Sequence, residues 1–310
     1  TDHCNLKCFF CSNEGMDFSR KNKTHINVEQ LKYLIQVLAD KGLKSISLTG
    51  GEPTMHPRIF DIVSFLNKFN FKNLFFHTNG ISLKEDLLKQ MSGSFNKVAV
   101  SLHSINFNTW QRLTKGTKKQ FRKLVRNLRM LSKFTDNFLV ELKFIPIKGY
   151  NDTEKEFSDF IKLCNDMGFK FKFLKLEPIM PEQIKMVVPF KEIQRRLINV
   201  GCQAGENDKE FRGQSNYLPI HKFRYKNTLG VAIEIGCGNP DTCRECHLSN
   251  EIFVTCDFKI KPCHMTNYQI DIDKFIKLKS KELIYQAIID SRIYLAGSPG
   301  ANFKVWQNNL

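Results

Sequence analysis

The sequence predicts an α/β protein, built as a partial (βα)6 TIM-like barrel with a small carboxyl-terminal domain. The first observation is an alternation: within residues 1–180, short apolar runs that end in small or polar residues are followed by amphipathic stretches of helical length. The second is a change after Pro178, where short β-like runs are interleaved with cysteines. We therefore expect a barrel domain over residues 1–180 and an auxiliary domain over residues 181–310.

The barrel domain is expected to alternate strands with helices. The strands cover residues 44–49, 73–78, 97–102, 138–145 and 169–176, and the helices cover residues 28–41, 57–69, 84–91, 119–134 and 153–167. Asn27, with Gln30 three residues later, is placed to cap the first helix. A further strand upstream of residue 1 would bring the number of strands to about six, the first of which delivers the chain to Cys4.

The second domain is expected to contain short β-like runs at residues 230–235, 252–255 and 258–261 and a last helix at residues 279–289. Residues 201–213, rich in Gly, Asn, Gln and charge, indicate an irregular connection.

Composition narrows the class of protein. No apolar run approaches the roughly 20 residues that span a bilayer, so no membrane partner is expected. The chain has 47 Lys and Arg against 31 Asp and Glu, a net charge of +16, which favours anionic partners or simply reflects a lysine-rich composition. Ten cysteines in 310 residues, gathered towards the two ends, are typical of metal binding in a reducing compartment, so we expect a cytoplasmic protein.

The first cysteine group is Cys4, Cys8 and Cys11, in a C-x3-C-x2-C pattern on one loop. Thiolates are the ligands that suit Fe–S clusters and zinc. Three ligands leave one iron of a four-iron cluster open, as a catalytic cluster requires. The alternative is a zinc knuckle completed by His3 or His25.

Polar motifs follow three of the expected strands. Gly50-Gly51-Glu52-Pro53 follows the first, Thr78-Asn79-Gly80 ends the second, and Ser101-Leu102-His103 ends the third. In barrels of this type, the carboxyl ends of the strands carry the chemistry. Glycines there allow a ligand to come close to the backbone, and a simple left-handed turn is the alternative reason for them.

These residues resemble the radical S-adenosylmethionine (SAM) superfamily, in which an aromatic residue, here Phe10, precedes the last cysteine of the cluster loop. The resemblance implies a [4Fe–4S] cluster on Cys4, Cys8 and Cys11 that cleaves SAM reductively, with an electron donor such as flavodoxin or ferredoxin. It also implies a set of SAM-binding residues: Phe10, Gly50, Gly51, Glu52, Pro53, Thr78, Asn79, Ser101 and His103.

The second cysteine group, Cys243, Cys246 and Cys263, lies in the expected second domain, with Cys237 or Cys256 as a possible fourth ligand. It resembles the auxiliary [4Fe–4S] domain of MoaA-type GTP cyclases, which act in molybdenum-cofactor synthesis. Two departures argue against GTP as substrate. Cys246 is followed by His247-Leu248 where those cyclases carry arginines, and Glu141-Leu142-Lys143 stands where they carry Lys-Leu-Asn.

The expected function is therefore hydrogen abstraction from a small, anionic or nucleotide-like substrate. Modification of a ribosomal peptide is the alternative within the same superfamily. A zinc-knuckle nucleic-acid-binding protein is the alternative from another class, although the sequence makes nucleic acid the less favoured partner. Lys172, Arg244, Lys259 and Lys261 are candidates for contact with an anion.

Overall fold

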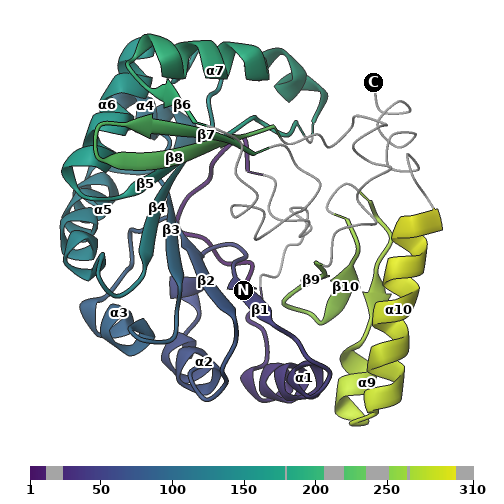
Figure 1. Ribbon diagram of the computed structural model, residues 1–310. Helices are drawn as coiled ribbons and strands as arrows, with labels where there is room; N and C mark the ends of the chain where they lie inside the picture. The colour runs from purple at the N-terminus through teal and green to yellow at the C-terminus, as the bar shows by residue number, and fades with distance from the viewer. Residues whose placement is uncertain (12–23, 179, 206–219, 235–250, 264–265, 298–310) are drawn as a thin grey trace.

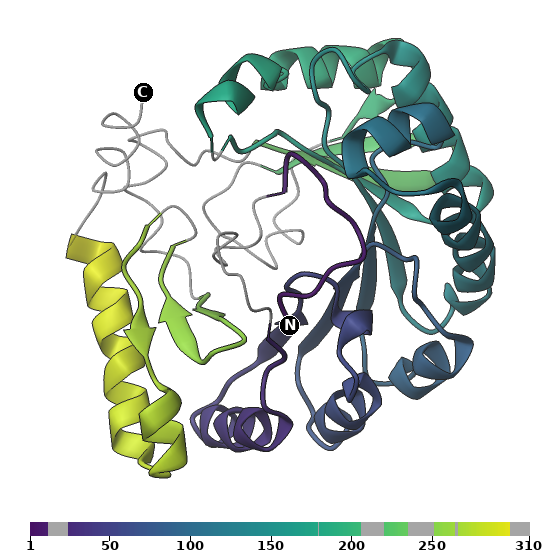
Figure 2. The same cartoon turned by 180° about the vertical axis from the view of Figure 1, so that it is seen from behind.

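The computed structural model of the chain describes residues 1–11, 24–178, 180–205, 220–234, 251–263 and 266–297. Eight strands form one curved sheet in the order β1-β2-β3-β4-β5-β8-β7-β6, with helices on its outer side (Figures 1 and 2). The parallel strands are β1 (Ser45–Leu48), β2 (Asn73–Thr78), β3 (Lys97–Ser101), β4 (Leu139–Phe144), β5 (Lys170–Leu174) and β8 (Thr228–Ile233). The sheet ends with β7 (Ile220–Tyr225) and β6 (Gln203–Ala204), both antiparallel to their neighbours. This arrangement confirms the predicted partial barrel.

The helices of the barrel are α1 (Val28–Asp40), α2 (Ile59–Leu66), α3 (Glu85–Met91), α4 (Phe107–Thr114), α5 (Lys118–Leu131), α6 (Glu154–Asp166) and α7 (Phe190–Asn199). Asn27 caps α1 as predicted, because its side chain accepts hydrogen bonds from the backbone N–H groups of Glu29 and Gln30. Our sequence-based expectations did not include α4, an eight-residue helix that buries Trp110, Leu113 and Thr114.

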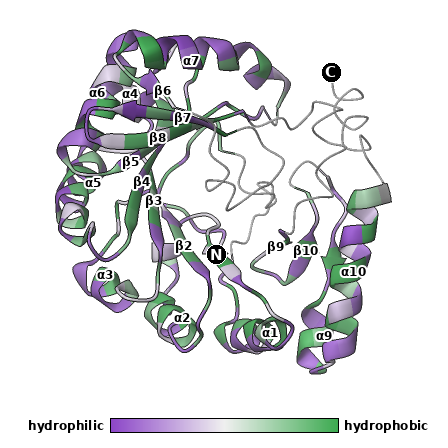
Figure 3. Ribbon diagram, in the orientation of Figure 1, coloured by the Kyte–Doolittle hydropathy of each residue, from purple (hydrophilic) through white to green (hydrophobic). Residues whose placement is uncertain are grey.

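Side chains alternate across the barrel strands, as strand geometry requires. On β2, Leu74 and Phe76 are buried in the main hydrophobic core, while Phe75 and His77 lie on the inner face. The outer core is rich in phenylalanine: the rings of Phe144, Phe157 and Phe173 lie 4.8 to 5.4 Å apart, between β4, β5 and α6. In Figure 3 the surrounding helices carry both hydrophobic and hydrophilic residues, as amphipathic helices between core and solvent do.

The run predicted at residues 230–235 is β8, and its position corrects the sequence analysis. It pairs in parallel with β5 instead of joining a separate domain, and Phe171 lies opposite Gly230. A Cβ at Gly230 would lie 2.0 Å from the Phe171 ring, so only glycine fits there. The main sheet thus contains strands from both sides of residue 180. The domain boundary expected at that residue stays a prediction.

The remaining elements form a carboxyl-terminal unit beside α1 (Figure 1). It contains the antiparallel strands β9 (Phe253–Val254), β10 (Lys259–Lys261) and β11 (Ile270–Asp271), followed by α9 (Asp273–Lys277) and α10 (Lys281–Gly297). Leu34 and Val37 of α1 belong to its hydrophobic cluster, so α1 packs on both parts of the molecule. The Tyr33 hydroxyl donates a hydrogen bond to the Lys279 carbonyl at 2.7 Å.

Across the residues the structure describes, we find no helix with the length and apolarity that crossing a bilayer requires.

Candidate active site

The loop that carries the first three cysteines is fixed by backbone contacts to distant elements. The Lys7 N–H donates to the Thr114 carbonyl at 2.9 Å, at the end of α4. The Gln120 amide of α5 donates to the Asn5 carbonyl at 2.8 Å. The Gln183 amide, from the short 3-10 helix η4 (Pro181–Met186), donates to the Phe9 carbonyl at 3.0 Å. The loop is therefore held in one conformation from three sides.

Cys4, Cys8 and Cys11 share one electrostatic environment. Burial raises the pKa of the Cys8 thiol well above its ordinary value, and the neighbouring Cys11 and Cys4 raise it further. A cluster of positive irons would reverse this effect and stabilise the thiolates. The donor set fits a [4Fe–4S] cluster with one iron not ligated by this loop.

A zinc knuckle and a four-iron cluster make different demands on their ligands. Throughout the described ranges, no three His, Cys, Asp or Glu side chains converge on one point as the ligands of a single ion would. A cubane instead takes one thiolate at each of three separate irons. His3 and His25 stack on each other, with ring centroids 4.3 Å apart, and the His25 Nδ1 lies 2.8 Å from the Thr1 hydroxyl.

The glycines of the Gly50-Gly51-Glu52-Pro53 turn lie against the segment that leads into Cys4. The Gly51 N–H donates to the Thr1 carbonyl at 2.8 Å, and the Glu52 N–H donates to the His3 carbonyl at 2.7 Å. A Cβ on Gly50 would come within 2.6 Å of the Thr1 oxygen, and one on Gly51 within 2.3 Å of the His3 oxygen. The chain's own backbone thus gives a reason for both glycines that does not depend on SAM.

Glu52 is fully buried and bonds two motifs together. Its Oε1 accepts hydrogen bonds from the hydroxyls of Thr54 at 2.6 Å and Thr78 at 2.7 Å, and its Oε2 accepts one from the Asn79 N–H at 2.7 Å. The Thr54 N–H also donates to Oε1, at 3.1 Å. Burial raises the pKa of this carboxyl, and the hydrogen bonds act in the opposite direction. Most of its acceptor capacity is used within the protein.

Asn79 extends this network to the cysteine loop. Its side-chain amide donates to Asn5 Oδ1 at 2.6 Å and lies 3.8 Å from Cys4 Sγ, while Asn5 donates to the Ser82 hydroxyl at 3.1 Å. Hydrogen bonds to a ligating sulfur are among the factors that set the potential of a cluster. The sequence analysis did not identify Asn5, Gln120 or Gln183, because polar residues of this kind carry no local signal of a contact so distant along the chain.

His103 is buried and has a φ of 62°, in the left-handed region. Its Nδ1 accepts a hydrogen bond from the Ile145 N–H at 3.1 Å, which places the proton of the neutral ring on Nε2. Burial, helped by the charge of Lys143, lowers the pKa of His103 to about 3. The ring packs edge-on against Phe10, with centroids 4.9 Å apart. His103 thus supports the residue next to Cys11, while Ser101 ends β3 nearby.

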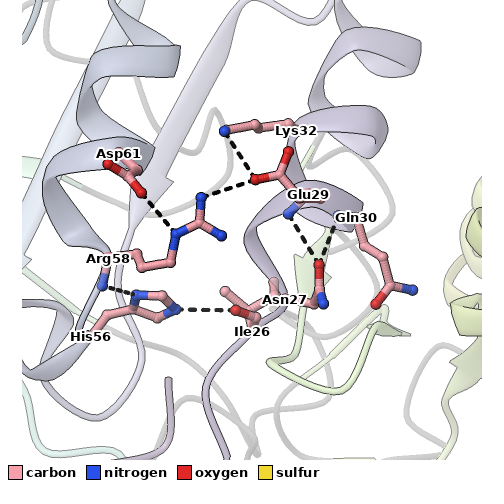
Figure 4. Close-up of polar contacts among 8 residues, drawn as sticks. All are labelled: Ile26, Asn27, Glu29, Gln30, Lys32, His56, Arg58 and Asp61. Carbon is pink, nitrogen blue, oxygen red and sulfur yellow. Dashed lines mark hydrogen bonds and ion pairs between the residues drawn. The ribbon is translucent and has the colours of Figure 1, made fainter.

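The segment after Pro53 connects the site to the helices (Figure 4). His56 Nδ1 accepts a hydrogen bond from the Arg58 N–H at 3.1 Å, so the neutral ring carries its proton on Nε2, 3.0 Å from the Ile26 carbonyl. Arg58 also pairs with Asp61 at 2.7 Å and with Glu29 at 2.9 Å. These bonds hold the starts of α1 and α2 together.

Charged side chains occupy the inner face of the barrel below these motifs. Lys97 Nζ lies 3.6 Å from Glu141 Oε1, and both side chains are 9% exposed. Lys143 Nζ contacts His77 Nδ1, and Lys143 is opposite Lys172 in the β4–β5 register. Burial raises the pKa of Glu141, but Lys172, Lys97 and Lys143 outweigh it and hold the pKa below its ordinary value. Burial and the same three lysines lower the pKa of His77 far below its ordinary value, so His77 is neutral.

The second cysteine group is only partly within the described residues: Cys237, Cys243 and Cys246 lie outside them. Cys256 lies in the turn between β9 and β10, where its Sγ is 3.1 Å from the Thr24 hydroxyl. Cys263 lies past the opposite end of the same hairpin, beyond the pair Phe253 and Lys261. This register argues against Cys256 as a ligand at the same site as Cys263.

The fold and the cysteine loop define a class of enzyme, and the comparison with known families agrees. The chain belongs to the radical SAM superfamily, whose model matches residues 1–164. The family implies a [4Fe–4S] cluster and SAM as cofactors. The chain is therefore an enzyme, and the alternative of a zinc-knuckle nucleic-acid-binding protein was wrong.

Curated relatives are GTP 3',8-cyclases. The one from Listeria welshimeri is 26% identical, over 93% of this chain and 85% of that protein. A probable GTP 3',8-cyclase from Thermococcus kodakarensis is 27% identical, over 86% of this chain and 83% of the relative. The resemblance to MoaA-type cyclases is thus confirmed.

Solved structures share the fold. Streptococcus suis SuiB bound to precursor peptide SuiA superposes with a TM-score of 0.64 at 13% identity, over 93% of this chain and 64% of that chain. The present chain thus spans about two thirds of the length of SuiB. The anSMEcpe protein with bound AdoMet gives a TM-score of 0.60 at 17% identity, over 92% of this chain and 77% of that one.

Proposed function

We propose that this enzyme cleaves SAM reductively at a [4Fe–4S] cluster held by Cys4, Cys8 and Cys11, and that the substrate is a small anion bound inside the barrel. When bound, the cluster would supply the one electron that the cleavage of SAM requires, and the 5'-deoxyadenosyl group released with methionine would take a hydrogen atom from the substrate to give 5'-deoxyadenosine. The single observation that carries the substrate class is the lysine-rich inner face of β3, β4 and β5.

The charge inside the barrel suits a substrate of modest negative charge. Lys97, Lys143 and Lys172 contribute three positive charges and Glu141 one negative charge, while His77 is neutral, so these five side chains, without Lys170 at the far end of β5 or Glu251 near Lys172, carry a balance of about +2. A carboxylate or a phosphate monoester would match this balance. A nucleoside triphosphate would bring more negative charge than these groups offset, and Glu141 would repel it.

His77 supports the same substrate class. Its Nδ1 contacts the Lys143 ammonium and acts as an acceptor there, so the proton of the neutral ring lies on Nε2. That Nε2 is buried and has no hydrogen-bond partner among the residues the structure describes. A buried donor without a partner costs about 1–3 kcal/mol, and an anionic oxygen would satisfy it.

The rim residues would hold and orient the cofactors. We propose that Gly50, Gly51, Pro53, Ser101 and Phe10 surround SAM. Glu52, Thr78, Asn79 and His103 act as positioning residues, because their polar atoms are engaged with the protein: Glu52 with Thr78 and Asn79, Thr78 also with Gly80, Asn79 with Asn5, and His103 with Ile145.

We further propose an auxiliary [4Fe–4S] cluster on Cys243, Cys246 and Cys263 in a carboxyl-terminal domain. Cys237 is the better candidate for a fourth ligand, since the hairpin register separates Cys256 from Cys263.

The test is anaerobic turnover of the reconstituted enzyme with SAM, dithionite and single candidate substrates. The panel contains a nucleoside monophosphate, GTP, small carboxylates and short peptides, each deuterated at exchange-stable positions, and deuterium in 5'-deoxyadenosine is measured. We expect transfer from a monophosphate or a carboxylate. Transfer from GTP or only from a peptide would overturn the proposed substrate class, and absence of 5'-deoxyadenosine with every candidate would overturn SAM cleavage itself.

Substitution of inner-face lysines locates the substrate. Lys172→Met should raise the substrate KM about tenfold or more, because one of two facing ammonium groups is lost. Lys170→Met is the matched control: it lies on the same face of β5, two residues farther from the rim, and pairs in register with Glu141. Equal effects of the two substitutions on KM would place the anion elsewhere.

A further inference from the structure

The outward face of α5 is uniformly basic. Within Lys118–Leu131 the helix has no acidic residue, and its exposed positions carry Lys118, Lys119, Arg122, Lys123, Arg126 and Arg129. Its buried positions, Leu124, Asn127, Leu128 and Leu131, lie on the opposite side of the helix, as its 3.6-residue period requires. Figure 3 shows α5 at the outer edge of the barrel. The lysines and arginines therefore point away from the core.

The two halves of this face differ in their surroundings. Arg126, Arg129 and Lys133 line a surface hollow of about 580 Å³ together with Glu85 and Asp86 of α3, so acidic groups partly offset their charge. Lys118, Lys119, Arg122 and Lys123 do not line this hollow. In the part of the chain that the structure describes, no ion pair is formed by any of these basic residues, so the two halves differ in the acidic side chains of the hollow.

The uncompensated half lies next to the cysteine loop. Gln120 of α5 bonds to the Asn5 carbonyl, and the chain just before α5 packs on the loop: a Cβ at Gly116 would lie 3.0 Å from Leu6. Lys7, within the loop, and Lys115, just before α5, are both exposed. We call the set Lys7, Lys115, Lys118, Lys119, Arg122 and Lys123 the loop-proximal basic face.

We propose that the loop-proximal basic face is the docking surface for an acidic one-electron carrier protein of the flavodoxin or ferredoxin class. This inference rests on the proposed function, since cleavage of each SAM consumes one electron and oxidises the reduced carrier by one electron. A carrier bound here would place its redox centre beside the loop that holds Cys4, Cys8 and Cys11. Charge complementarity both orients such a carrier and speeds its encounter with the enzyme.

A nucleic acid is the other polyanion that a basic helix could bind. A phosphate backbone would contact all the exposed lysines and arginines of α5, including Arg129, and also Lys133, because the charges of a phosphate backbone are evenly spaced. Concentration of uncompensated charge at the end nearest the cysteine loop favours the redox partner.

The experiment compares two double substitutions of equal charge, one near the start of α5 and one at its end, where Lys133 lies in the 3-10 turn that follows the helix. Lys118→Glu with Arg122→Glu alters the loop-proximal basic face. Arg129→Glu with Lys133→Glu is the matched control, which starts 11 residues, or about 16 Å, farther along the helix axis. Both variants should retain the iron content and melting temperature of the native enzyme, because all four side chains are exposed.

Two readouts are measured on the reconstituted enzyme. The first is the Kd for an acidic bacterial flavodoxin, by calorimetry at low and high salt, with an acidic ferredoxin and a DNA duplex in parallel. The second is the rate of 5'-deoxyadenosine formation at subsaturating reduced flavodoxin and, separately, with dithionite. We expect the loop-proximal variant to weaken flavodoxin or ferredoxin binding and to slow carrier-driven cleavage, both at least tenfold, while the control changes each less than threefold. Dithionite-driven cleavage should be equal in all three proteins.

Equal weakening by both variants, no binding of either carrier to the native enzyme, or a larger loss of DNA binding than of carrier binding would each overturn the docking surface. Absence of 5'-deoxyadenosine with dithionite would instead overturn the proposed function, so the two failures are distinguishable.

Discussion

The rim of the barrel and the carboxyl-terminal unit are built in different ways. At the rim, short motifs at the ends of neighbouring strands are bonded to one another: Glu52 to Asn79, and Asn79 to Asn5. In the carboxyl-terminal unit, strands of two or three residues are stabilised mainly by a hydrophobic cluster shared with α1. Local motifs and hydrogen bonds therefore set the geometry of the rim, whereas packing on α1 positions the β9–β10 hairpin that precedes Cys263.

This contrast makes different substitutions informative in the two regions. A change at the rim should disturb cofactor binding directly, since each bonded side chain positions another. A change in the carboxyl-terminal unit should affect the proposed auxiliary [4Fe–4S] cluster and leave the one at Cys4, Cys8 and Cys11 intact. The reason is that this unit has a hydrophobic core of its own, separated by α1 from the core of the barrel.

The largest effect is expected for Cys8→Ala. Loss of one of three thiolates removes a cluster ligand, so 5'-deoxyadenosine formation should fall at least about a hundredfold, together with iron at this site. Iron and sulfide analysis and chromatography of the adenosine product measure both quantities. Cys164→Ala is the control, because Cys164 is fully buried on α6 and away from the loop. Wild-type cleavage by Cys8→Ala would show that the loop does not hold the cluster.

The second region is tested by comparing Cys263→Ser with Cys256→Ser. If both proposed clusters have four irons, Cys263→Ser should reduce iron from about eight to about four per chain and abolish product while SAM is still cleaved. Cys256→Ser should leave the iron content unchanged, because Cys256 lies at the other end of the hairpin. The reverse pattern would assign Cys256 to the auxiliary site.

Glu52→Gln tests the bonded rim. The substitution replaces one acceptor oxygen with an NH2 group that faces protein donors, so the free energy of unfolding should fall by about 3 kcal/mol. SAM affinity should also weaken, because Thr78 and Asn79 lose their shared acceptor. Chemical denaturation and SAM titration measure the two effects. Glu29→Gln, on the exposed side of α1, should change neither measurement appreciably. Equal stability of Glu52→Gln and the native enzyme would contradict the proposal that Glu52 holds Thr78 and Asn79 together.

The sequence predicted β1 to β5 and the helices between them except α4, together with the short motifs at the strand ends, because helices, strands and turns depend on residues close together in the chain. It did not predict that β8 pairs with β5, since nothing local in residues 228–233 specifies a partner at residues 170–174. The same limit applies to Gln183, whose amide bonds to Phe9 across 174 positions. The inner-face charges illustrate a further limit: which of Lys97, Glu141, Lys143 and Lys172 lie beside one another depends on the register of the strands, which no local pattern specifies.

The smallest effect concerns His103 and the pH dependence of stability. Its pKa is lowered in the native state, from an ordinary value of 6.5 to about 3. The unfolded chain therefore takes up a proton at this residue as the pH falls below about 6.5, while the native chain does not. The free energy of unfolding consequently decreases as the pH is lowered. Between pH 7 and pH 5 this loss is about 2 kcal/mol, because it accumulates over the roughly 1.5 pH units below 6.5, at 1.36 kcal/mol for each unit. In His103→Gln, whose amide oxygen can still accept from Ile145, the loss over that interval should be smaller by the same amount. Denaturation at pH 7 and pH 5 measures it, and identical losses for the two proteins would mean that His103 is protonated in the folded enzyme and is not the neutral support of Phe10.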